Sequence, residues 1–334
     1  MSIGVGVLGT GSIGADHARR LSRRVSGAHL AAVFDVDPHR LSAVREELGV
    51  AGHDRAEDLI EDPAVEAVVI ASPGSTHTDL VLACTEMGKP VLCEKPLAPT
   101  TKECLQILEA EVGRGSRLVR VGFMRRYDRG YVQVKRAIDE GNIGVPLVLH
   151  CIHRNLTAPS FFTSDMTMTD AAVHEFDVAR WLLREELVQV AQVPVKRSPL
   201  VPEPLRDPQV VLCKSESGVL VEVELFVSSQ YGYDVRCEVV GSTGLASLET
   251  PTTSAVVHRG LRIQGIAPDW QTRFALAYLD ELQDWVDGLR SGHTTGPTAW
   301  DGYAATAVAE ACMRSDDKGG WTAVSLVDRP KLYW

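Results

Sequence analysis

The chain has 334 residues, of which 45% are hydrophobic and 23% charged, and it carries a formal net charge of -10 at pH 7. A chain of this length is expected to form two domains, because single hydrophobic cores rarely grow beyond ~250–300 residues. The acidic balance argues against a nucleic-acid-binding protein, which would usually present a basic face. It is compatible with a phosphate-bearing cofactor, because backbone N–H groups can hold phosphate without charged side chains.

The cysteines and the N-terminus give expectations about location. The seven cysteines are irregularly spaced and include no C-x-x-C pair, so we predict buried, reduced thiols rather than a disulfide framework or a zinc site, and no metal. The N-terminus lacks the pattern of a signal peptide, and no apolar run approaches ~18 residues. We therefore expect a cytoplasmic protein that does not interact with a membrane.

The first third of the chain alternates strand and helix patterns. Strands are predicted near residues 5–8, 29–34, 66–71, 90–93 and 118–123, and helices near 13–24, 38–48, 75–87 and 102–111. Asp37-Pro38 predicts a capped helix start, and Gly49 predicts its end. Continuously apolar strands that alternate with helices indicate a parallel sheet covered on both faces. The predicted fold class is α/β, with a doubly wound domain over residues 1–121.

The pattern changes at residue 122, where we place the start of a second domain that runs to residue 334. Helices are predicted near residues 130–140, 170–183, 272–289 and 303–315, and strands near 147–153, 210–213, 219–227, 235–240 and 246–248. A loop rich in Thr, Ser and Pro covers residues 157–168. The successive strands with short turns indicate an antiparallel meander.

A glycine-rich segment follows the first predicted strand and opens the first helix. It reads Gly9-Thr10-Gly11-Ser12-Ile13-Gly14, a G-x-G-x-x-G pattern in the strand-to-helix context that dinucleotide binding requires. Asp35 follows the second strand, where a carboxylate accepts from the ribose hydroxyls and repels a 2′-phosphate. We therefore predict NAD as the cofactor, although the nearby Arg40 would tolerate NADP. The predicted cofactor contacts here are Gly9, Gly11, Ser12, Ile13, Gly14 and Asp35.

Two further segments follow predicted strands at their carboxyl ends. Ala71-Ser72-Pro73-Gly74-Ser75-Thr76-His77 follows the strand near residues 66–71, and Cys93-Glu94-Lys95-Pro96 follows the strand near residues 90–93. Open α/β sheets bind ligands at this edge, so we expect Ser72, Pro73, His77, Glu94 and Lys95 to lie beside the cofactor. The alternative is a plain strand–turn–helix junction and a solvated lysine.

The glycine-rich segment together with Cys93-Glu94-Lys95-Pro96 resembles the Gfo/Idh/MocA oxidoreductase family over essentially the whole chain. The resemblance implies an N-terminal Rossmann domain and a C-terminal α/β domain with a large, open, mainly antiparallel sheet. It also implies that Lys95, in the Glu-Lys-Pro motif, is an active-site lysine. Gly74 departs from the family, because many members carry asparagine there. Members are commonly tetramers through the open sheet, so we expect a homo-oligomer, specifically a tetramer.

Three segments resemble the inositol dehydrogenase branch of that family. They are Gly122-Phe123-Met124-Arg125-Arg126-Tyr127-Asp128, His153-Arg154-Asn155 and Asp170-Ala171-Ala172-Val173-His174-Glu175. The resemblance implies NAD-dependent oxidation of a cyclic polyol, myo-inositol, to its 2-keto product. It makes Lys95, Asp170 and His174 the catalytic residues. The implied substrate contacts are these three together with Arg125, His153, Asn155 and Tyr233.

The three catalytic candidates suit this chemistry. Oxidation of a hydroxyl removes a hydride from carbon and a proton from oxygen, and a histidine such as His174, with an ordinary pKa near ~6.5, suits the proton. Asp170 lies four residues earlier, so on an α-helix both side chains share one face. Lys95 would stabilise developing alkoxide charge. Taken singly, each has a structural alternative: His174 as a core histidine, Asp170 as a helix N-cap and Lys95 as a solvated lysine.

Other functions stay open at this stage. The same chemistry on scyllo-inositol, an aminocyclitol or a pyranose sugar is poorly separated from myo-inositol, because a few side chains on loops read the orientation of one hydroxyl. A non-catalytic NAD-binding sensor is the alternative from another class of protein. The presence of Lys95, Asp170 and His174 together argues against that sensor.

Overall fold

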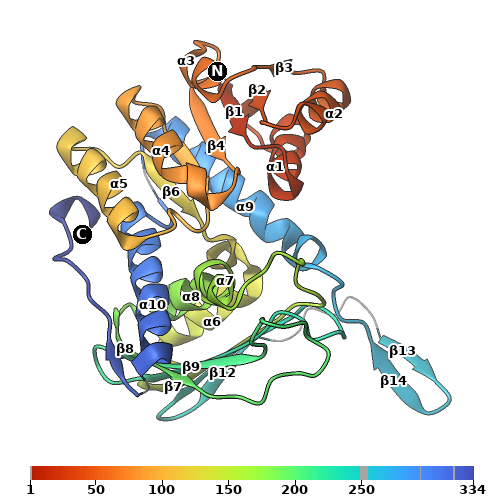
Figure 1. Ribbon diagram of the computed structural model, residues 1–334, viewed down its shortest axis with the longest axis vertical. Coiled ribbons are helices and arrows are strands. Elements are labelled where there is room, and N and C mark those ends of the chain that lie inside the picture. Colours follow the sequence, from red (N-terminus) through yellow and green to blue (C-terminus); the bar gives the residue numbers. More distant parts are fainter. Residues whose placement is uncertain (1, 249–254, 294, 319) are drawn as a thin grey trace. The chain divides into compact units, whose positions relative to one another are not determined.

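The computed structural model describes residues 2–248, 255–293, 295–318 and 320–334 (Figure 1). It divides into two compact units. The first unit comprises Met1–Met124, Tyr278–Thr306 and Val327–Trp334, and the second comprises Arg125–Ala277 and Ala307–Leu326. The first unit therefore takes segments from both ends of the chain. The assignment of cofactor binding to residues 1–121 and of substrate binding to residues 122–334 stays a prediction.

The first unit is built on a six-stranded parallel sheet, as the alternating pattern predicts. The strands lie in the order β3-β2-β1-β4-β5-β6, and each neighbouring pair is parallel. Their bounds are β1 Ile3–Leu8, β2 Ala28–Phe34, β3 Ala51–Gly52, β4 Ala67–Ile70, β5 Val91–Glu94 and β6 Val119–Gly122. The strand order reverses between β1 and β4, and in doubly wound sheets ligands bind at the carboxyl ends of the strands beside such a reversal.

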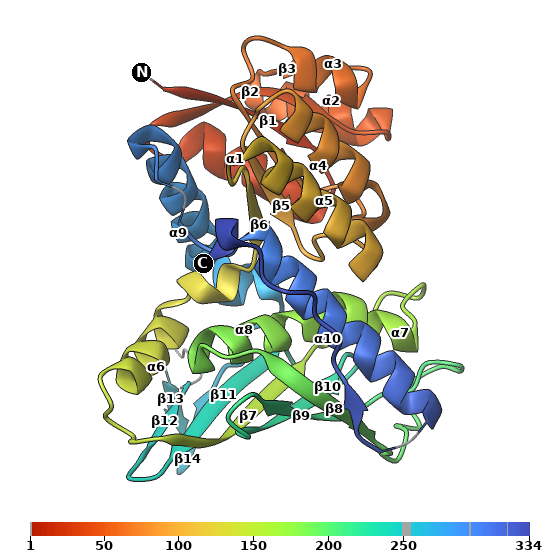
Figure 2. The same cartoon turned by 90° about the vertical axis from the view of Figure 1, so that its left-hand side faces the viewer.

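Helices cover both faces of this sheet. They are α1 Ser12–Arg23, α2 Pro38–Leu48, α3 Ala56–Glu61, α4 His77–Glu86, α5 Thr101–Arg114 and the part of α9 (Trp270–Ser291) that begins at Tyr278. Val7, Leu21 and Trp285 belong to one buried cluster, in which α1, α2 and α9 pack on the same face. Figure 2 shows α1 and α9 on one side of the sheet and α4 and α5 on the other.

The ends of α2 show how local sequence determines a helix. Oδ1 of Asp37 accepts hydrogen bonds from the backbone nitrogens of His39 and Arg40, at 2.9 and 3.4 Å. Pro38 occupies the first helical position, and Gly49 ends the helix with a left-handed φ of +64°. The predicted cap and the predicted stop are therefore both confirmed.

The second unit is built on a seven-stranded sheet in the order β12-β11-β7-β10-β9-β8-β15. The bounds are β7 Pro146–Arg154, β8 Leu187–Val193, β9 Gln209–Ser215, β10 Leu220–Phe226, β11 Asp234–Gly241, β12 Leu245–Ser247 and β15 Thr322–Ala323. A separate hairpin pairs β13 Ala255–His258 with β14 Leu261–Gln264. The sheet is mainly antiparallel, as the family resemblance implies, with one parallel pair formed by β7 and β10.

The prediction of a simple meander is wrong at one place. β8, β9 and β10 are consecutive antiparallel neighbours, but β7 lies between β10 and β11. The connection between β10 and β11 covers residues 227–233, and at ~3.3 Å per residue it is long enough to pass the ~10 Å across an intervening strand. Turn residues indicate that the chain reverses, but they carry no information about which strand lies between the two arms.

Helices cover one face of this second sheet. They are α6 Arg129–Asp139, α7 Ser164–Met166, α8 Val173–Leu183 and the part of α10 (Ala299–Lys318) that begins at Ala307, with a π-helical turn over Thr167–Ala172. Leu149 and Cys151 of β7 are buried, and the alternate residues Val148 and Ile152 are half-exposed. Figure 2 shows α6 and α8 against one face, and among the described residues no helix covers the opposite face.

All seven cysteines are buried, free thiols, as the irregular spacing predicts. Burial raises the pKa of Cys84 to about 12, so this thiol stays protonated and unreactive at neutral pH. Within the described ranges, none of the helices has the length and apolar character needed to cross a membrane.

Candidate active site

The glycine-rich segment forms a tight turn between β1 and α1. A Cβ at Gly14 would lie 1.9 Å from the carbonyl oxygen of Gly9, and a Cβ at Gly9 would lie 2.6 Å from the nitrogen of Ser72. Packing therefore requires glycine at both positions. Gly11 is different, because the nearest atom to a Cβ there is Nη1 of Arg40, at 3.8 Å. Gly11 thus leaves open space at the start of α1, where a pyrophosphate needs close approach to the backbone.

The first turn of α1 is suited to an anion. The helix begins at Ser12, and its N-cap Gly11 has no side chain with which to cap the first turn. Ser12 is exposed and Ile13 is half-buried. The N–H groups of a first helical turn lack intrahelical acceptors, and the helix dipole places partial positive charge there. The residues present therefore fit the phosphates of a dinucleotide.

Asp35 directly follows β2 and lies beside the glycine-rich turn. Its Oδ2 accepts from the backbone nitrogen of Thr10 at 2.5 Å and from the Thr10 hydroxyl at 3.1 Å. Its Oδ1 accepts from the backbone nitrogen of Asp37 at 2.8 Å. The carboxylate is thereby fixed at the edge of the turn, where an anionic acceptor fits a ribose diol and disfavours a 2′-phosphate. The exposed side chain of Arg40 lies close to Asp37, with Nε 3.4 Å from Oδ2.

His77 is buried between two loops at the carboxyl edge of the sheet. Its Nδ1 lies 2.7 Å from the carbonyl oxygen of Pro96, and its Nε2 lies 2.9 Å from the carbonyl oxygen of Ser72. Burial lowers the pKa of His77, and this effect exceeds that of the hydrogen bonds to the two carbonyl groups, which raise it. The His77 ring thus lies between the two loops, with a carbonyl acceptor facing each nitrogen, and a neutral ring donates to one of the two. Ser72 is half-buried and Pro73 is exposed at the same edge.

The Glu-Lys-Pro motif begins at the end of β5, on this edge. Glu94 is buried, with Oε1 2.7 Å from Nε2 of His17. Its Oε2 accepts from the backbone nitrogen of Lys95 at 3.3 Å. Lys95 is half-buried and precedes a cis peptide bond to Pro96. The structure therefore directs the carboxylate of Glu94 to His17, and a contact between Glu94 and the cofactor stays a prediction.

In the second unit, the buried side chains of Arg125, His153 and Glu175 form a polar cluster with the half-buried Asn155. Arg125 and Glu175 form an ion pair in which each side chain is only 1% exposed. Nδ1 of His153 lies 3.2 Å from Oε2 of Glu175 and 3.2 Å from Nη2 of Arg125. Nε2 of His153 lies 3.0 Å from Oδ1 of Asn155. Arg125 is therefore buried, and its guanidinium contacts Glu175 and His153.

The ion pair is charged at neutral pH. Burial raises the pKa of the Glu175 carboxyl, but the charges of Arg125 and His153 and their hydrogen bonds outweigh it, so this pKa lies below its ordinary value. Burial lowers the pKa of Arg125, and the charge of Glu175 reverses that effect, so the pKa of Arg125 lies above its ordinary value. A fixed pair of opposite charges thus holds one side of the His153 ring.

His174, on α8, extends this cluster. It is 6% exposed, and its ring centroid lies 6.4 Å from that of His153. The centroid of His153 lies 5.9 Å from that of Tyr233, whose own ring lies 6.1 Å from Phe274. The structure therefore brings three of the predicted site residues, His153, His174 and Tyr233, together on the helix-covered side of the second sheet.

Asp170 lies in the π-helical turn that precedes α8. The expectation of a regular α-helix from residue 170 is wrong, because Thr167–Ala172 form the π turn and α8 begins at Val173. The alternative that Asp170 caps the helix is also wrong, because Ala172 is the N-cap of α8. A π turn closes i→i+5 hydrogen bonds, so the α-helical i,i+4 rule does not relate Asp170 to His174. Such turns occur frequently at functional sites.

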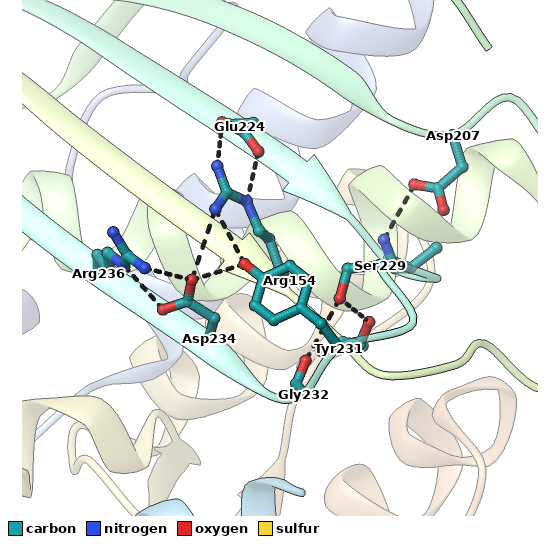
Figure 3. A network of polar contacts seen from close by, with 10 residues as sticks. Arg154, Asp207, Glu224, Ser229, Tyr231, Gly232, Asp234 and Arg236 are labelled. Atoms are coloured by element: carbon teal, nitrogen blue, oxygen red, sulfur yellow. Dashed lines mark hydrogen bonds and ion pairs between the residues drawn. The ribbon is translucent and has the colours of Figure 1, made fainter. Parts of the chain in front are cut away.

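Tyr231 and Tyr233 have different surroundings. Tyr233 is 6% exposed and contacts His153. The Tyr231 hydroxyl donates to Oδ2 of Asp234 at 2.7 Å and accepts from Nη1 of Arg154 at 2.9 Å (Figure 3). Tyr231 therefore belongs to a polar network on the uncovered face of the sheet, which leaves Tyr233 as the tyrosine of the cluster.

Two residues at these sites were not predicted from the sequence. Glu175 follows His174 directly in Val173–Leu183, a largely apolar segment. An acidic residue in such a segment could have indicated a buried carboxylate with a partner. His17 had a weaker signal, a single histidine among the polar residues of α1. Both side chains are buried against partners far along the chain, at separations of 50 and 77 residues.

Both domains of the chain match known protein families, and the full chain matches known enzymes. The family model described as the oxidoreductase family, NAD-binding Rossmann fold, matches residues 3–123, and that described as the oxidoreductase family, C-terminal alpha/beta domain, matches residues 135–324. Inositol 2-dehydrogenase 1 of Saccharopolyspora erythraea is 51% identical over 335 residues, which cover 100% of this chain and 99% of that protein. Inositol 2-dehydrogenase of Burkholderia cenocepacia is 45% identical with the same coverage.

A solved structure gives the same result for the fold. Myo-inositol dehydrogenase from Lactobacillus casei, in complex with NAD(H) and myo-inositol, superposes with a TM-score of 0.96 at 33% identity, and the match covers 100% of both chains. The two domain models and these full-length relatives agree with each other and with the Rossmann sheet of the first unit. The chain therefore belongs to the Gfo/Idh/MocA family of oxidoreductases, whose N-terminal domain is an NAD-binding Rossmann fold.

Proposed function

We propose that this protein is an NAD-dependent inositol 2-dehydrogenase that oxidises myo-inositol to 2-keto-myo-inositol (scyllo-inosose). The observation that carries the proposal is the full-length similarity to the Lactobacillus casei enzyme, whose structure contains NAD(H) and myo-inositol. Relatives of 45–51% identity that are named inositol 2-dehydrogenase support the same activity. The cluster around His153 adds chemical support, because it offers the closely spaced donors and acceptors that a polyol needs.

The cofactor would be held at the carboxyl edge of the first sheet. Gly11 leaves the space that the pyrophosphate needs, and Asp35 presents a fixed acceptor to the ribose. When bound, oxidised nicotinamide is the acceptor for the hydride lost from the substrate carbon. The residues proposed to line the cofactor are Gly9, Gly11, Ser12, Ile13, Gly14, Asp35, Ser72, Pro73, His77, Glu94 and Lys95.

We assign the proton chemistry to three residues. His174 is the proposed general base, which takes the proton from the reacting hydroxyl. Its buried place next to His153 supports this role, because a base must be held in one orientation to reach that proton. Lys95 would hydrogen-bond the same oxygen and stabilise its developing negative charge. Asp170 would accept a hydrogen bond from the substrate or orient His174.

The remaining polar residues of the cluster would set substrate recognition. His153, Asn155 and Tyr233 are the proposed contacts for the other hydroxyl groups of the ring. A direct contact with Arg125 was also expected, but its 1% exposure favours an indirect role, in which the guanidinium orients His153. A rigid set of donors and acceptors suits a substrate whose isomers differ only in the orientation of single hydroxyl groups.

The test is NADH formation from NAD by the purified protein, with myo-inositol, scyllo-inositol, an aminocyclitol and glucose in parallel. Strong preference for myo-inositol is the expected result. Activity on only one of the other polyols would preserve the proposed catalytic residues and refute the substrate assignment. NADH binding without activity on any of the four compounds would refute the proposed dehydrogenase activity and favour a non-catalytic NAD-binding sensor.

We also propose that the uncovered face of the second sheet is buried in a homo-oligomer, a tetramer. Half-buried apolar side chains lie on this face, namely Val148, Ile152, Leu212, Leu220, Phe226 and Val240. Between them, Arg154 donates to Glu224 at 2.6 and 2.8 Å, and Arg236 donates to Asp234 at 2.8 Å (Figure 3). Mixed apolar and paired polar groups suit a protein interface. Light scattering at micromolar concentration should give the mass of four chains, and a monomer would contradict the proposal.

The proposed compartment is the cytoplasm. The seven free, buried thiols support it, because reduced cysteines are typical of a reducing compartment. Osmotic-shock fractionation of the native host should retain the protein with the cytoplasmic fraction, and its release with the periplasm or medium would refute this location.

A further inference from the structure

His17 connects the cofactor helix to the Glu-Lys-Pro motif. It lies on α1, the helix that begins at the glycine-rich turn, and its side chain is fully buried. Its Nε2 lies 2.7 Å from Oε1 of Glu94, the last residue of β5. Neither the family match nor the names of the relatives gives a role to this contact. It joins the element that meets the pyrophosphate to the strand end from which Lys95 extends.

The geometry places the ring proton of His17 on Nε2. Its Nδ1 is buried and has no hydrogen-bond partner in the part of the chain that the structure describes, so a proton there would be unsatisfied. A proton on Nε2 instead points at a carboxylate oxygen of Glu94 at hydrogen-bond distance. His17 therefore donates through Nε2, and its bond to a carboxylate belongs to the stronger class of protein hydrogen bonds.

The carboxylate of Glu94 occupies a narrow slot. On one side its Oε2 accepts from the backbone nitrogen of Lys95 at 3.3 Å. On another side is Gly122 of β6, where a Cβ would lie 3.0 Å from Oε2. The His17 ring is itself held by Tyr278, whose ring meets it edge-on with centroids 5.7 Å apart. Both partners of the His17–Glu94 contact are therefore held by further neighbours in the first unit.

We propose that His17 is a positioning residue for Lys95. It fixes the carboxylate of Glu94, and Glu94 fixes the backbone at the point where Lys95 leaves the strand. His77 holds the next residue through the carbonyl oxygen of Pro96, so the motif is anchored on both sides of the lysine. A long, flexible lysine side chain is positioned reproducibly only when its backbone is fixed. The inference rests on the proposed role of Lys95 in catalysis.

The test uses full-length variants that separate turnover from stability. His17→Leu removes the donor and leaves the Glu94 carboxylate buried without it. His17→Leu/Glu94→Gln removes that buried charge as well, so its thermal midpoint should lie above that of the single variant. His17→Gln restores an amide N–H near the position of Nε2. The matched control is His53→Leu, which breaks a similar contact, 3.0 Å between His53 Nε2 and Asp62 Oδ2, elsewhere in the first unit.

A positioning role predicts a specific pattern of kinetic constants. For His17→Leu we expect kcat with NAD and myo-inositol to fall by about tenfold or more, because misplacement of a catalytic group by ~1 Å can cost about a hundredfold. The Kd for NADH, measured by fluorescence titration, should stay within about threefold. His17→Gln should recover kcat to within about threefold of the wild type. The double variant should recover stability but not kcat, and His53→Leu should match the wild-type kcat.

The opposite results would overturn the inference. If kcat of the double variant recovers together with its thermal midpoint, or if His17→Leu keeps the wild-type kcat, His17 has only a packing role. The wild type and Lys95→Ala are measured beside these variants. An inactive wild type, or a Lys95→Ala variant with normal kcat, would instead refute the proposed function of Lys95. The role of His17 would then be refuted too, because it depends on that function.

Discussion

Glu175→Gln tests the buried ion pair that contacts His153. Both side chains of the Arg125–Glu175 pair are 1% exposed, so loss of the negative charge leaves the guanidinium buried. Removing one partner of a buried pair typically costs about 3–5 kcal/mol. Glutamine keeps an amide oxygen that accepts one hydrogen bond, so we expect the low end of that range, ~3 kcal/mol, in the free energy of unfolding. Urea titration followed by circular dichroism measures this change.

A double variant separates the charge from the packing. Arg125→Met/Glu175→Leu removes both charges and should recover most of the lost stability, because apolar replacement of a whole buried pair is often neutral. In this double variant His153 lacks its polar partners at Nδ1, so we expect its KM for myo-inositol to be about tenfold above the wild-type value. Glu140→Gln, in the exposed pair with Arg136, is the control and should leave unfolding unchanged. A Glu175→Gln protein as stable as the wild type would refute the reasoning.

The pH dependence of this effect has a defined sign. The pKa of Glu175 in the folded protein lies below its ordinary value, which for glutamate is about 4.3. The ionised carboxylate therefore contributes stability that is fully present above roughly pH 4.3 and is lost as the pH falls through the lower folded pKa. The difference in unfolding free energy between the wild type and Glu175→Gln should be constant near neutral pH and shrink in stronger acid. A difference that grows on acidification would contradict the ion pair.

Four further substitutions test the cofactor edge and one buried acid. Lys95→Ala should lower kcat by about a hundredfold or more while NADH binding persists, and near-normal turnover would remove Lys95 from the mechanism. Asp35→Ser loses the acceptor held by Thr10, so the kcat/KM ratio for NAD over NADP should fall by about tenfold or more; an unchanged ratio would place discrimination elsewhere. Gly11→Ala adds a Cβ whose nearest contact is Nη1 of Arg40 at 3.8 Å, so the thermal midpoint should stay unchanged while NADH affinity falls by about tenfold. Unchanged affinity would exclude close approach of the pyrophosphate. Burial raises the pKa of Asp207 to about 6, above the ordinary ~3.9. The wild type should therefore lose roughly 2 kcal/mol of unfolding free energy between about pH 4 and 7, and Asp207→Asn should not. Equal losses of unfolding free energy in the two proteins, measured by parallel urea titrations, would refute this.

Features with local causes could be predicted from the sequence. The cap at Asp37 and the stop at Gly49 depend on the conformation of a few consecutive residues, and both are found where the pattern placed them. The glycine-rich turn is similar, because Gly9 and Gly14 are required by contacts within the turn and with the neighbouring strand end. The parallel order of the first sheet followed from alternating strands and helices, since such connections leave few other topologies.

Features that depend on distant segments could not be predicted in this way. The place of β7 between β10 and β11 is decided by which strand edges are left to pair, and each strand has the same alternating pattern whichever neighbour it takes. The π turn at Thr167–Ala172 is also invisible in the pattern, because one extra residue in a helical turn shifts the apolar spacing no more than ordinary variation does. The prediction of a regular α-helix was therefore wrong in the segment that contains Asp170.

The same distinction applies within the candidate site. A motif identifies the groups proposed to meet the substrate or cofactor, such as Lys95 and His174, because their spacing resembles that of known enzymes. It does not identify the groups that orient them, because burial of a charged residue requires a partner from another part of the chain. Glu175 is compatible with burial only because Arg125 lies 50 residues away in sequence and beside it in space, and Glu94 similarly depends on His17. A polyol dehydrogenase must distinguish hydroxyl groups that differ only in direction, so such orienting residues should affect isomer selectivity as strongly as the residues that touch the ring.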